Sequence, residues 1–205
     1  MDKLHYNIIA SGSSGNCVTV EDVMIDCGVP FKKIKEQLYD IHYLLLTHTH
    51  SDHIKHTTYQ NIRRLFPKIL TIGNYEVHQA FGVDQISNEG FEIVTKNYTF
   101  LPFRCPHDVL VHGYVWKKND LDIIYATDTE TLEYAPERRY DYFFIESNHD
   151  EKKLEQIRSS QKYGYNAYAS GLRHLSTQKS KAFYYLYRKN DRAQWIELHK
   201  SRRFY

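Results

Sequence analysis

Cysteine is scarce in this sequence of 205 residues, which contains only Cys17, Cys27 and Cys105. The three are odd in number and lack the paired spacing of a disulfide framework or a zinc-binding motif. We therefore expect reduced thiols in a cytoplasmic protein rather than disulfides or metal ligands.

Long hydrophobic runs are also missing, because no stretch approaches the roughly 18–20 consecutive apolar residues that span a bilayer. The first seven residues, M-D-K-L-H-Y-N, lack the apolar core of a secretion signal. Repeats, low-complexity tracts and linkers are absent as well. A hydrophobic content of 41% with 18 tyrosines predicts a packed core. We expect one domain over residues 1–205 that is not associated with a membrane.

Positive charge is distributed unevenly along the chain. Residues 1–150 contain 14 lysines and arginines against 21 acidic residues, a net charge of −7. Residues 151–205 contain 13 against four, a net charge of +9. Clustered Lys and Arg raise the local concentration of phosphates, so this basic quarter favours a polyanionic substrate. A solvated basic helix face without a ligand is the alternative interpretation.

The most informative stretch is residues 42–53, H-Y-L-L-L-T-H-T-H-S-D-H. It begins with an apolar run of the kind that forms a strand buried on both faces. Three imidazoles and a carboxylate follow directly, at His48, His50, Asp52 and His53. Alternation in an extended loop places His48 and His50 on one side, where both can reach one ion. Asp52 and His53 lie where the chain turns and can face a second ion.

Imidazole and carboxylate groups together suit zinc, manganese or iron. A buried strand that delivers such a pattern at its end predicts a metal site rather than a surface loop rich in histidine. The motif T-H-T-H-S-D-H resembles the signature of the metallo-β-lactamase superfamily. This resemblance implies an α/β fold, the four-layer αββα sandwich, with a mono- or dinuclear metal site. The superfamily catalyses several reactions, so the fold alone names none of them.

Apolar runs between turn residues predict the secondary structure along the chain. Helices are expected from Pro30 to about Leu38, over 54–66 and 75–81, near 150–160, and from a cap at Ser176 to about Arg188. A tyrosine-rich loop is expected between the last two helices. Strands are expected over 6–10, 17–20, 23–25, 41–46, 69–72, 121–126, 142–145 and 195–198, with two or three more within 91–116.

Residues 11–16, S-G-S-S-G-N, join the first two predicted strands. Their glycines and serines expose backbone N–H groups and hydroxyls that could cradle an oxyanion or a phosphate. A plain hairpin turn explains the same composition equally well. Both interpretations stay open at the level of sequence.

Later predicted strands also stop at groups that can bind a metal. His107 lies six residues before Gly113, and Asp128 follows the strand expected over 121–126. His174 and His199 belong to R-H-L-S-T and L-H-K-S-R-R-F-Y. A lone histidine is more often a hydrogen-bonded core or surface residue than a ligand. Several such groups at strand ends, after a metal motif, favour a shared site.

Short motifs throughout the chain are similar to those of the RNase Z and YycJ-like group of metallo-β-lactamase-fold nucleases and phosphodiesterases. S-G-S-S-G-N near the start and E-S-N-H-D at 146–150 resemble the YycJ-type proteins. H-x5-G-Y at 107–114, T-D-T at 127–129 and H-x-S-x-R-[FY] at 199–204 resemble RNase Z. The long Gly/Pro-rich insertion with which RNase Z grips tRNA is absent, which argues against tRNA 3′-processing.

The resemblance implies two divalent ions per chain, Zn²⁺ or Mn²⁺, and a role for each motif residue. One ion would be held by His48, His50, His107 and Asp128, and the other by Asp52, His53 and His199, with Asp128 shared. Asp26 would support the metal loop from behind, as metal ligands usually require.

Three residues are implied in catalysis, namely Asp52, His174 and Glu146. His174 would protonate the leaving oxygen, and Glu146 would orient that imidazole. The roles of His174 and His199 could be exchanged, because each is followed by serine at the second position. The strand end and the S-x-R-[FY] tail favour His199 as the ligand.

A second set of polar residues is expected to bind the substrate. It comprises Ser13, Ser14, Asn16, His149, Arg173, Ser201 and Arg203. Arg173, Arg202 and Arg203 could bind phosphate oxygens in a bidentate manner, although plain solvent-facing side chains would have the same sequence. Arg173 stands where the family has glycine, which would narrow the pocket around His174.

These residues together predict a metal-dependent phosphodiester hydrolase, a nuclease acting on DNA or RNA. Hydrolysis of a small phosphodiester such as a cyclic nucleotide is the first alternative. The second is a non-enzymatic, metal-containing nucleic-acid-binding protein. The basic C-terminal quarter favours a polymeric substrate, and the full ligand set favours an enzyme. Lactamase or thioesterase activity is disfavoured because neither requires His174 or the arginines.

Overall fold

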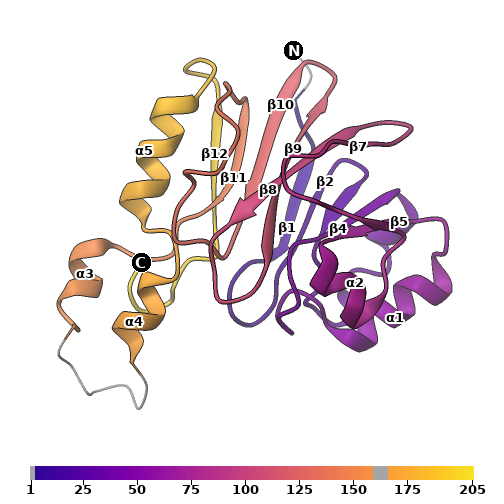
Figure 1. Cartoon of the computed structure of the whole chain (residues 1–205), viewed down its shortest axis with the longest axis horizontal. Helices are drawn as coiled ribbons and strands as arrows, with labels where there is room; N and C mark the ends of the chain where they lie inside the picture. The colour runs from indigo at the N-terminus through magenta and orange to yellow at the C-terminus, as the bar shows by residue number, and fades with distance from the viewer. Residues whose placement is uncertain (1–2, 159–165) are drawn as a thin grey trace. The chain divides into compact units, whose positions relative to one another are not determined.

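A computed structural model describes residues 3–158 and 166–205. The chain divides into two compact units, one up to Asn88 and one from Glu89 onward (Figure 1). Each unit contains one six-stranded mixed sheet, with strand order β1-β2-β3-β4-β5-β6 in the first and β12-β11-β10-β9-β8-β7 in the second. No helix within the described ranges is long and apolar enough to cross a membrane.

The first unit has antiparallel strands at one side of its sheet and parallel strands at the other. Its strands are β1 Tyr6–Ala10, β2 Cys17–Val20, β3 Val23–Ile25, β4 Tyr43–Leu46, β5 Leu70–Gly73 and β6 Gln85–Ile86. Its helices are the 3₁₀ turns η1 Phe31–Lys33 and η2 Gln37–Tyr39, and the α-helices α1 His56–Leu65 and α2 Tyr75–Phe81.

Strand β4 is central in the first sheet and all four of its residues are buried. Leu44 and Leu46 belong to the same buried cluster as Ile62 of α1 and Val77 of α2. Both helices therefore cover the face of the sheet to which these leucines point. This packing holds the end of β4, and with it the start of the metal motif, inside a rigid framework.

The prediction of a helix from Pro30 to about Leu38 is wrong. Two short 3₁₀ turns take its place, because Lys33 N–H bonds to Pro30 O and Ile34 N–H bonds to Phe31 O in i to i+3 steps. The segment needs only to bring Ile34 and Leu38 into the core, where both are fully buried. Burial of two side chains, rather than helix propensity, determines this conformation.

The second unit carries parallel strands at one side and antiparallel strands at the other. Its strands are β7 Ile93–Val94, β8 Thr99–Cys105, β9 Val111–Lys118, β10 Leu121–Ala126, β11 Tyr142–Glu146 and β12 Gln194–Leu198. Its helices are α3 Glu151–Glu155, α4 Ala167–Leu172 and α5 Thr177–Tyr187.

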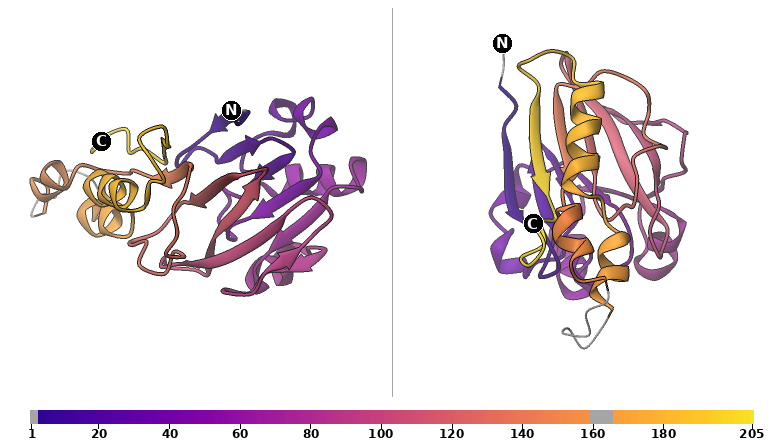
Figure 2. Two further views of the ribbon diagram at one scale, coloured as in Figure 1. Left: turned by 90° about the horizontal axis from the view of Figure 1, so that it is seen from above. Right: turned by 90° about the vertical axis from the view of Figure 1, so that its left-hand side faces the viewer.

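Helix α5 lies along β11 and β12, as the right-hand view in Figure 2 shows. Phe183 and Tyr184 of α5 pack edge-on against Phe143 of β11, with ring centroids 6.1 and 5.2 Å apart. Strands β10, β11 and β12 run parallel, so their carboxyl ends meet at the same edge of the sheet. The residues that follow these three strands are therefore brought together.

Most of the expected elements are present within a residue or two of their predicted bounds. The cap at Ser176 is confirmed, because its side chain accepts a hydrogen bond from Lys179 N–H at the start of α5. The helix expected near 150–160 is shorter, and residues 159–165 of the tyrosine-rich loop lie outside the described residues. Strand β6 and helix α4 were not predicted.

Candidate functional site

The metal motif forms a tight loop directly after β4 in the first unit. His48 and His53 are buried, and His50 and Asp52 are half-buried. The chain turns because His53 N–H bonds to His50 O at 2.9 Å. Ring centroids of His48 lie 4.6 Å from His50 and 4.1 Å from His53, so the loop gathers three imidazoles as the spacing predicts.

A buried carboxylate behind the loop fixes the direction of these rings. His53 Nδ1 donates to Asp26 Oδ2 at 2.7 Å, and the N–H of Thr47 donates to Asp26 Oδ1 at 2.9 Å. The Thr47 hydroxyl lies 3.0 Å from His48 Nδ1 and also bonds to Asp26. With the Nδ1 side of His48 and His53 held, the Nε2 side of each ring has a defined direction. Thr47, which sequence reasoning missed, directly precedes His48, the first predicted ligand.

Asn16 closes the turn over residues 11–16 and also holds the metal loop. Its Oδ1 accepts from Gly12 N–H at 2.7 Å, and its Nδ2 lies 2.7 Å from His53 Nε2. The Asn16 side chain is buried, whereas Ser13 and Ser14 are exposed at the tip of the turn. The turn is thus a hairpin between β1 and β2 that is tied to the metal loop.

Gly28 lies against the same loop at a distance that no side chain allows. A Cβ at this position would stand 1.7 Å from Asp52 O. The neighbouring backbone pairs Cys27 N–H with His53 O at 2.8 Å and Gly28 N–H with Asn16 O at 2.9 Å. The absence of a side chain at Gly28 therefore lets the loop pack onto the end of β3.

The second unit brings four predicted site residues together at the carboxyl ends of β10, β11 and β12 and at the start of α5. One donor atom each from Asp128, Glu146, His174 and His199 lies within 4.8 Å of the others. Glu146 Oε1 accepts from His174 Nδ1 at 2.7 Å and from His199 Nδ1 at 3.0 Å. Asp128 Oδ1 lies 3.4 and 3.2 Å from the same two nitrogens.

Glu146 is the centre of this cluster and is completely buried. Its second oxygen accepts from the N–H groups of Thr129 and Leu175, at 3.0 and 3.3 Å. Burial alone would raise the pKa of Glu146, but the charges and hydrogen bonds of His174 and His199 lower it below its ordinary value.

The pKa of His174 is shifted in the opposite direction. Burial alone would lower its pKa, but the charge of Glu146 and the bonds to Asp128 and Glu146 raise it well above its ordinary value. A carboxylate and a protonated imidazole therefore face each other at neutral pH.

Backbone strain marks the same residues. Among the described residues, five non-glycine positions have positive φ, and three of these are Asp26 (59°), Asp128 (49°) and His199 (51°). Such conformations are uncommon outside glycine and cluster at functional sites. Asn148 holds one of them, because its Nδ2 donates to His199 O at 2.8 Å. Sequence reasoning assigned no role to Asn148, although it lies within the E-S-N-H-D motif.

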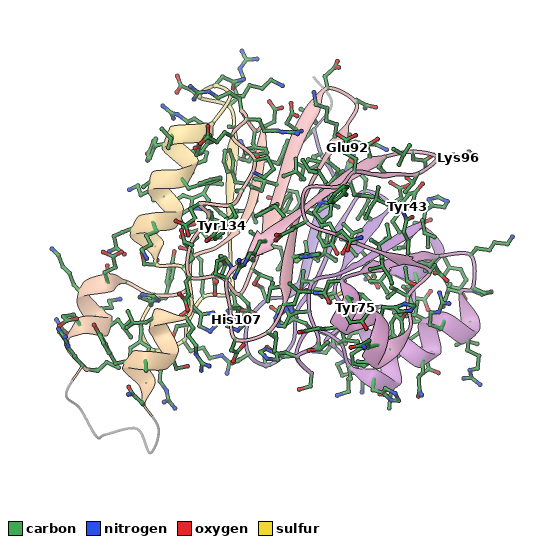
Figure 3. The ribbon with its side chains drawn as sticks, viewed as in Figure 1. Tyr43, Tyr75, Glu92, Lys96, His107 and Tyr134 are labelled. Carbon is green, nitrogen blue, oxygen red and sulfur yellow. The ribbon has the colours of Figure 1, made fainter. Side chains whose placement is uncertain are left out.

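His107 lies in the loop that joins β8 and β9 (Figure 3). Its Nδ1 donates to Arg173 O at 3.2 Å, and its ring centroid lies 5.3 Å from that of His174. Burial lowers the pKa of His107, so the ring is neutral at neutral pH, as a metal ligand must be.

Arg173 forms an ion pair with Asp108, at 2.9 Å between Nη1 and Oδ2. The guanidinium expected to bind phosphate is thus already engaged by a carboxylate that sequence reasoning missed. Asp108 follows His107 directly, and nothing in the sequence connects it with Arg173.

Two of the remaining predicted substrate residues, His149 and Ser201, lie next to Asn148, which bonds to His199. His149 is buried, and its backbone pairs with the N-terminus of α5 through Thr177 N–H. The Ser201 hydroxyl accepts from the N–H groups of Arg203 and Phe204, both at 3.3 Å, and so caps a turn. Arg203 is exposed.

The donor chemistry of both clusters fits a divalent metal ion. Imidazole nitrogens and carboxylate oxygens are the ligands that zinc and manganese accept. Among the described residues, no cysteine belongs to a cluster that could hold a metal ion, and burial raises the pKa of Cys17, Cys27 and Cys105. The expectation of free cysteines is confirmed.

No family model matches the chain. Exodeoxyribonuclease WalJ of Streptococcus pneumoniae serotype 2 is 31% identical over 172 residues, which cover 71% of this chain and 62% of WalJ. Exodeoxyribonuclease YycJ of Bacillus anthracis is 28% identical over 181 residues, which cover 74% of this chain and 65% of YycJ. The chain therefore spans less than two thirds of the length of either relative.

Solved structures extend the similarity to almost the whole chain. The metallo-β-lactamase fold protein YhfI from Bacillus subtilis matches 96% of this chain and 85% of its own, with a TM-score of 0.69 and 13% identity. The chain has the metallo-β-lactamase fold. The short form of human tRNase Z gives a TM-score of 0.69 at 12% identity and covers 97% of this chain and 93% of its own.

The similarity to solved structures confirms the predicted fold class. The sequence similarity to WalJ and YycJ supports the predicted resemblance to the YycJ-like and RNase Z-like branch. The roles of individual residues in this metallo-β-lactamase-fold protein stay predictions. The first unit brings His48, His50, Asp52 and His53 together, and the second unit does the same for Asp128, Glu146, His174 and His199.

Proposed function

We propose that this chain is a metal-dependent phosphodiester hydrolase that cleaves nucleic acid, DNA or RNA. The observation that carries the proposal is the buried Glu146, bonded through one oxygen to both His174 and His199 beside Asp128. This arrangement provides a held, protonated imidazole next to groups that can bind a metal. The names of WalJ and YycJ, both exodeoxyribonucleases, support a DNA substrate.

The proposal includes two divalent ions, Zn²⁺ or Mn²⁺, with the ligands that the resemblance implies. His48, His50, His107 and Asp128 would hold one, and Asp52, His53 and His199 would hold the other together with Asp128. When bound, two such ions supply a water of lowered pKa and positive charge for the phosphoryl oxygens.

His174 and His199 have different roles in this proposal. The side chain of His174 is 17% exposed and that of His199 is 7% exposed, which supports His174 as the group that reaches the substrate. His174 would hand its proton to the departing oxygen, and Glu146 would hold the ring in position for that transfer. His199, which shares Glu146 Oε1, would be oriented as a ligand by the same carboxylate.

Substrate binding would involve three groups of residues. Ser13 and Ser14 are exposed in the hairpin turn, and His149, Ser201 and Arg203 lie near the second cluster. Asn16 would act through the metal loop, because its amide is already bonded there. Arg173 could reach a phosphate only by leaving Asp108 or by sharing its guanidinium. The free cysteines support a cytoplasmic location.

One experiment tests the proposal. Metal-saturated protein should contain about two ions per chain, following two-metal logic, and should cleave labelled single- or double-stranded oligonucleotides as well as bis(p-nitrophenyl) phosphate. Zn²⁺ and Mn²⁺ would be compared after removal of all metal. Absence of hydrolysis of every phosphodiester with either ion would overturn the proposal. Cleavage of cyclic nucleotides without cleavage of oligonucleotides would favour the small-molecule alternative.

A further inference from the structure

The first unit carries an open hollow to which the proposed catalytic groups contribute no residue. Its volume is about 940 Å³, and it lies along α1 and the segment 80–83 at the end of α2. None of the described residues that line it is acidic. A hollow of this size without a carboxylate is suited to an anionic ligand.

One wall of the hollow is a stripe of hydrogen-bond donors on α1. His56, Gln60 and Arg64 follow one another at i, i+4 and i+8, and all three are exposed. Gln60 Nε2 lies 3.4 Å from His56 Nε2, and Arg64 Nη2 donates to Asn61 Oδ1 at 3.1 Å. At 1.5 Å per residue the stripe is about 12 Å long. Successive stacked bases lie about 3.4 Å apart, so the stripe is long enough to extend past more than one nucleotide.

An aromatic ring also lines the hollow, next to the stripe on α1. The centroid of Phe81 lies 6.0 Å from that of His56 and 6.0 Å from that of Tyr59. The Tyr59 hydroxyl donates to Gly82 O at 2.5 Å and so joins α1 to the segment that carries Phe81. A half-buried ring is thereby held next to an exposed imidazole.

At the far end of the hollow lie two neighbouring arginines, Arg63 and Arg64, which have different partners. Arg63 Nη1 donates to Asp84 Oδ2 at 2.5 Å and to Thr71 Oγ1 at 3.1 Å, which neutralises its charge and fixes α1 to the core. Arg64 has no ion pair among residues 3–158 and 166–205, and its charge is therefore the one offered to a ligand.

The near end of the hollow adjoins the metal loop. His56, the first residue of α1, comes three positions after His53, and Ile54 N–H bonds to His50 O at 2.8 Å. A strand whose scissile phosphate lies at the metal loop would therefore have its neighbouring nucleotides within reach of α1. A small phosphodiester would not extend so far.

We propose that this hollow binds the nucleotides next to the scissile phosphodiester of a single nucleic-acid strand. A base stacks on Phe81 and His56, and a neighbouring phosphate bonds to Arg64. Aromatic stacking accepts every base, and a lone cation beside it matches the repeating phosphate charge. This inference rests on the proposed function, because it needs a polymer at the metal loop.

Binding of a fluorescently labelled deoxythymidine hexanucleotide, measured by anisotropy in a chelator, tests the inference without turnover. Phe81→Leu should weaken binding by about 5- to 150-fold, the usual worth of one stacked base. Arg64→Gln should reduce the slope of log affinity against log salt by about 0.7, the value for one lost phosphate contact on a single strand. Lys33→Gln, which alters an exposed cation of the same unit outside the hollow, should match the wild type.

A second measurement separates the hollow from the proposed function. With metal present, both variants should hydrolyse bis(p-nitrophenyl) phosphate at the wild-type rate while their KM for the oligonucleotide rises. Wild-type protein that hydrolyses neither substrate would count against the proposed function, and the anisotropy series would still decide the role of the hollow. Unchanged hexanucleotide affinity and salt slope in both folded variants would overturn this inference alone. An acidic peptide that displaces the hexanucleotide at equal concentration would also overturn it, because charge without bases would then suffice.

Discussion

Glu146 holds two histidines through one oxygen, and the distinction between these histidines is the main question at the scale of single residues. Both Nδ1 atoms face Glu146 and Asp128, so the distances to these carboxylates do not distinguish the two histidines. The exposed fraction of the side chain differs, at 17% for His174 and 7% for His199. His174 lies in the loop that precedes α5, whereas His199 directly follows β12.

The first prediction separates catalyst from ligand. His174→Ala should retain both metal ions and lose turnover by about 10²- to 10⁴-fold, the usual contribution of proton transfer. The loss should shrink for p-nitrophenolate esters, because this leaving group departs without a proton. His199→Ala should lose metal and be poor on every substrate. Metal analysis of the two variants that gave the reverse pattern would exchange the two roles.

The second prediction concerns His112, which is buried in β9. Burial lowers the pKa of His112 from 6.5 to about 4. Between these values the unfolded chain binds the proton and the folded chain does not, so stability falls as pH decreases. At 1.36 kcal/mol per pKa unit, the loss from pH 7.5 to pH 4 is about 3 kcal/mol.

Urea unfolding of the metal-free protein at several pH values measures this effect. His112→Gln should flatten the decline in the free energy of unfolding over this range, because glutamine does not titrate. Parallel pH profiles for the wild type and His112→Gln would contradict the assignment.

At the scale of elements, the metal loop is held by its neighbours rather than by its own sequence. The end of β3 supplies Asp26 and Gly28, and the hairpin turn supplies Asn16. The loop therefore depends on two segments that come before it in the chain. In the second unit, the parallel strands β10, β11 and β12 end at one edge of the sheet and so bring their site residues together.

The third prediction tests this support at Gly28. Gly28→Ala would place a methyl group 1.7 Å from Asp52 O, so the loop must move away from β3. We expect metal binding to weaken by at least about tenfold, in the range found for lost outer-shell partners, while circular dichroism stays close to the wild type. Lys35→Ala, at an exposed position of the same unit, is the control. Unchanged metal affinity in Gly28→Ala would show that the loop tolerates the displacement.

At the scale of the whole molecule, the basic C-terminal quarter is less available than its net charge of +9 indicates. Within the described part of this quarter, ion pairs with carboxylates are formed by Arg158, Arg173, Arg188, Lys189 and Lys200. Such pairs reduce the charge that a polyanion meets. The arginines of the S-x-R-[FY] tail, Arg202 and Arg203, are both exposed.

The fourth prediction uses salt to measure the charge that remains available. Affinity for single-stranded DNA should fall with ionic strength, with a slope well below that of 13 phosphate contacts. Arg202→Ala and Arg203→Ala should each reduce the slope by about 0.7 if each contacts one phosphate. Lys200→Ala, which removes a cation paired with Glu197, should change it less. Salt-independent binding would contradict a polyanionic substrate.

The amino-acid sequence by itself determined the features that depend on neighbouring residues. The buried strand before His48, the cap at Ser176 and the bounds of α2 all follow from local patterns, and the structure repeats them. The ligand motif is equally local, because alternation and one turn gather His48, His50 and His53. Short-range geometry is sufficient to bring these three rings together, whereas their orientation depends on Asp26 and Asn16 from other segments.

Only the tertiary structure decided which distant partners each polar group finds. Asn16 bonds to the metal loop 37 residues away, and Arg173 pairs with Asp108 across 65 residues. The sharing of Glu146 by His174 and His199 depends on parallel strands that end together. A buried polar group must be hydrogen-bonded, but the partner that satisfies it is set by packing between remote segments, which no local pattern contains.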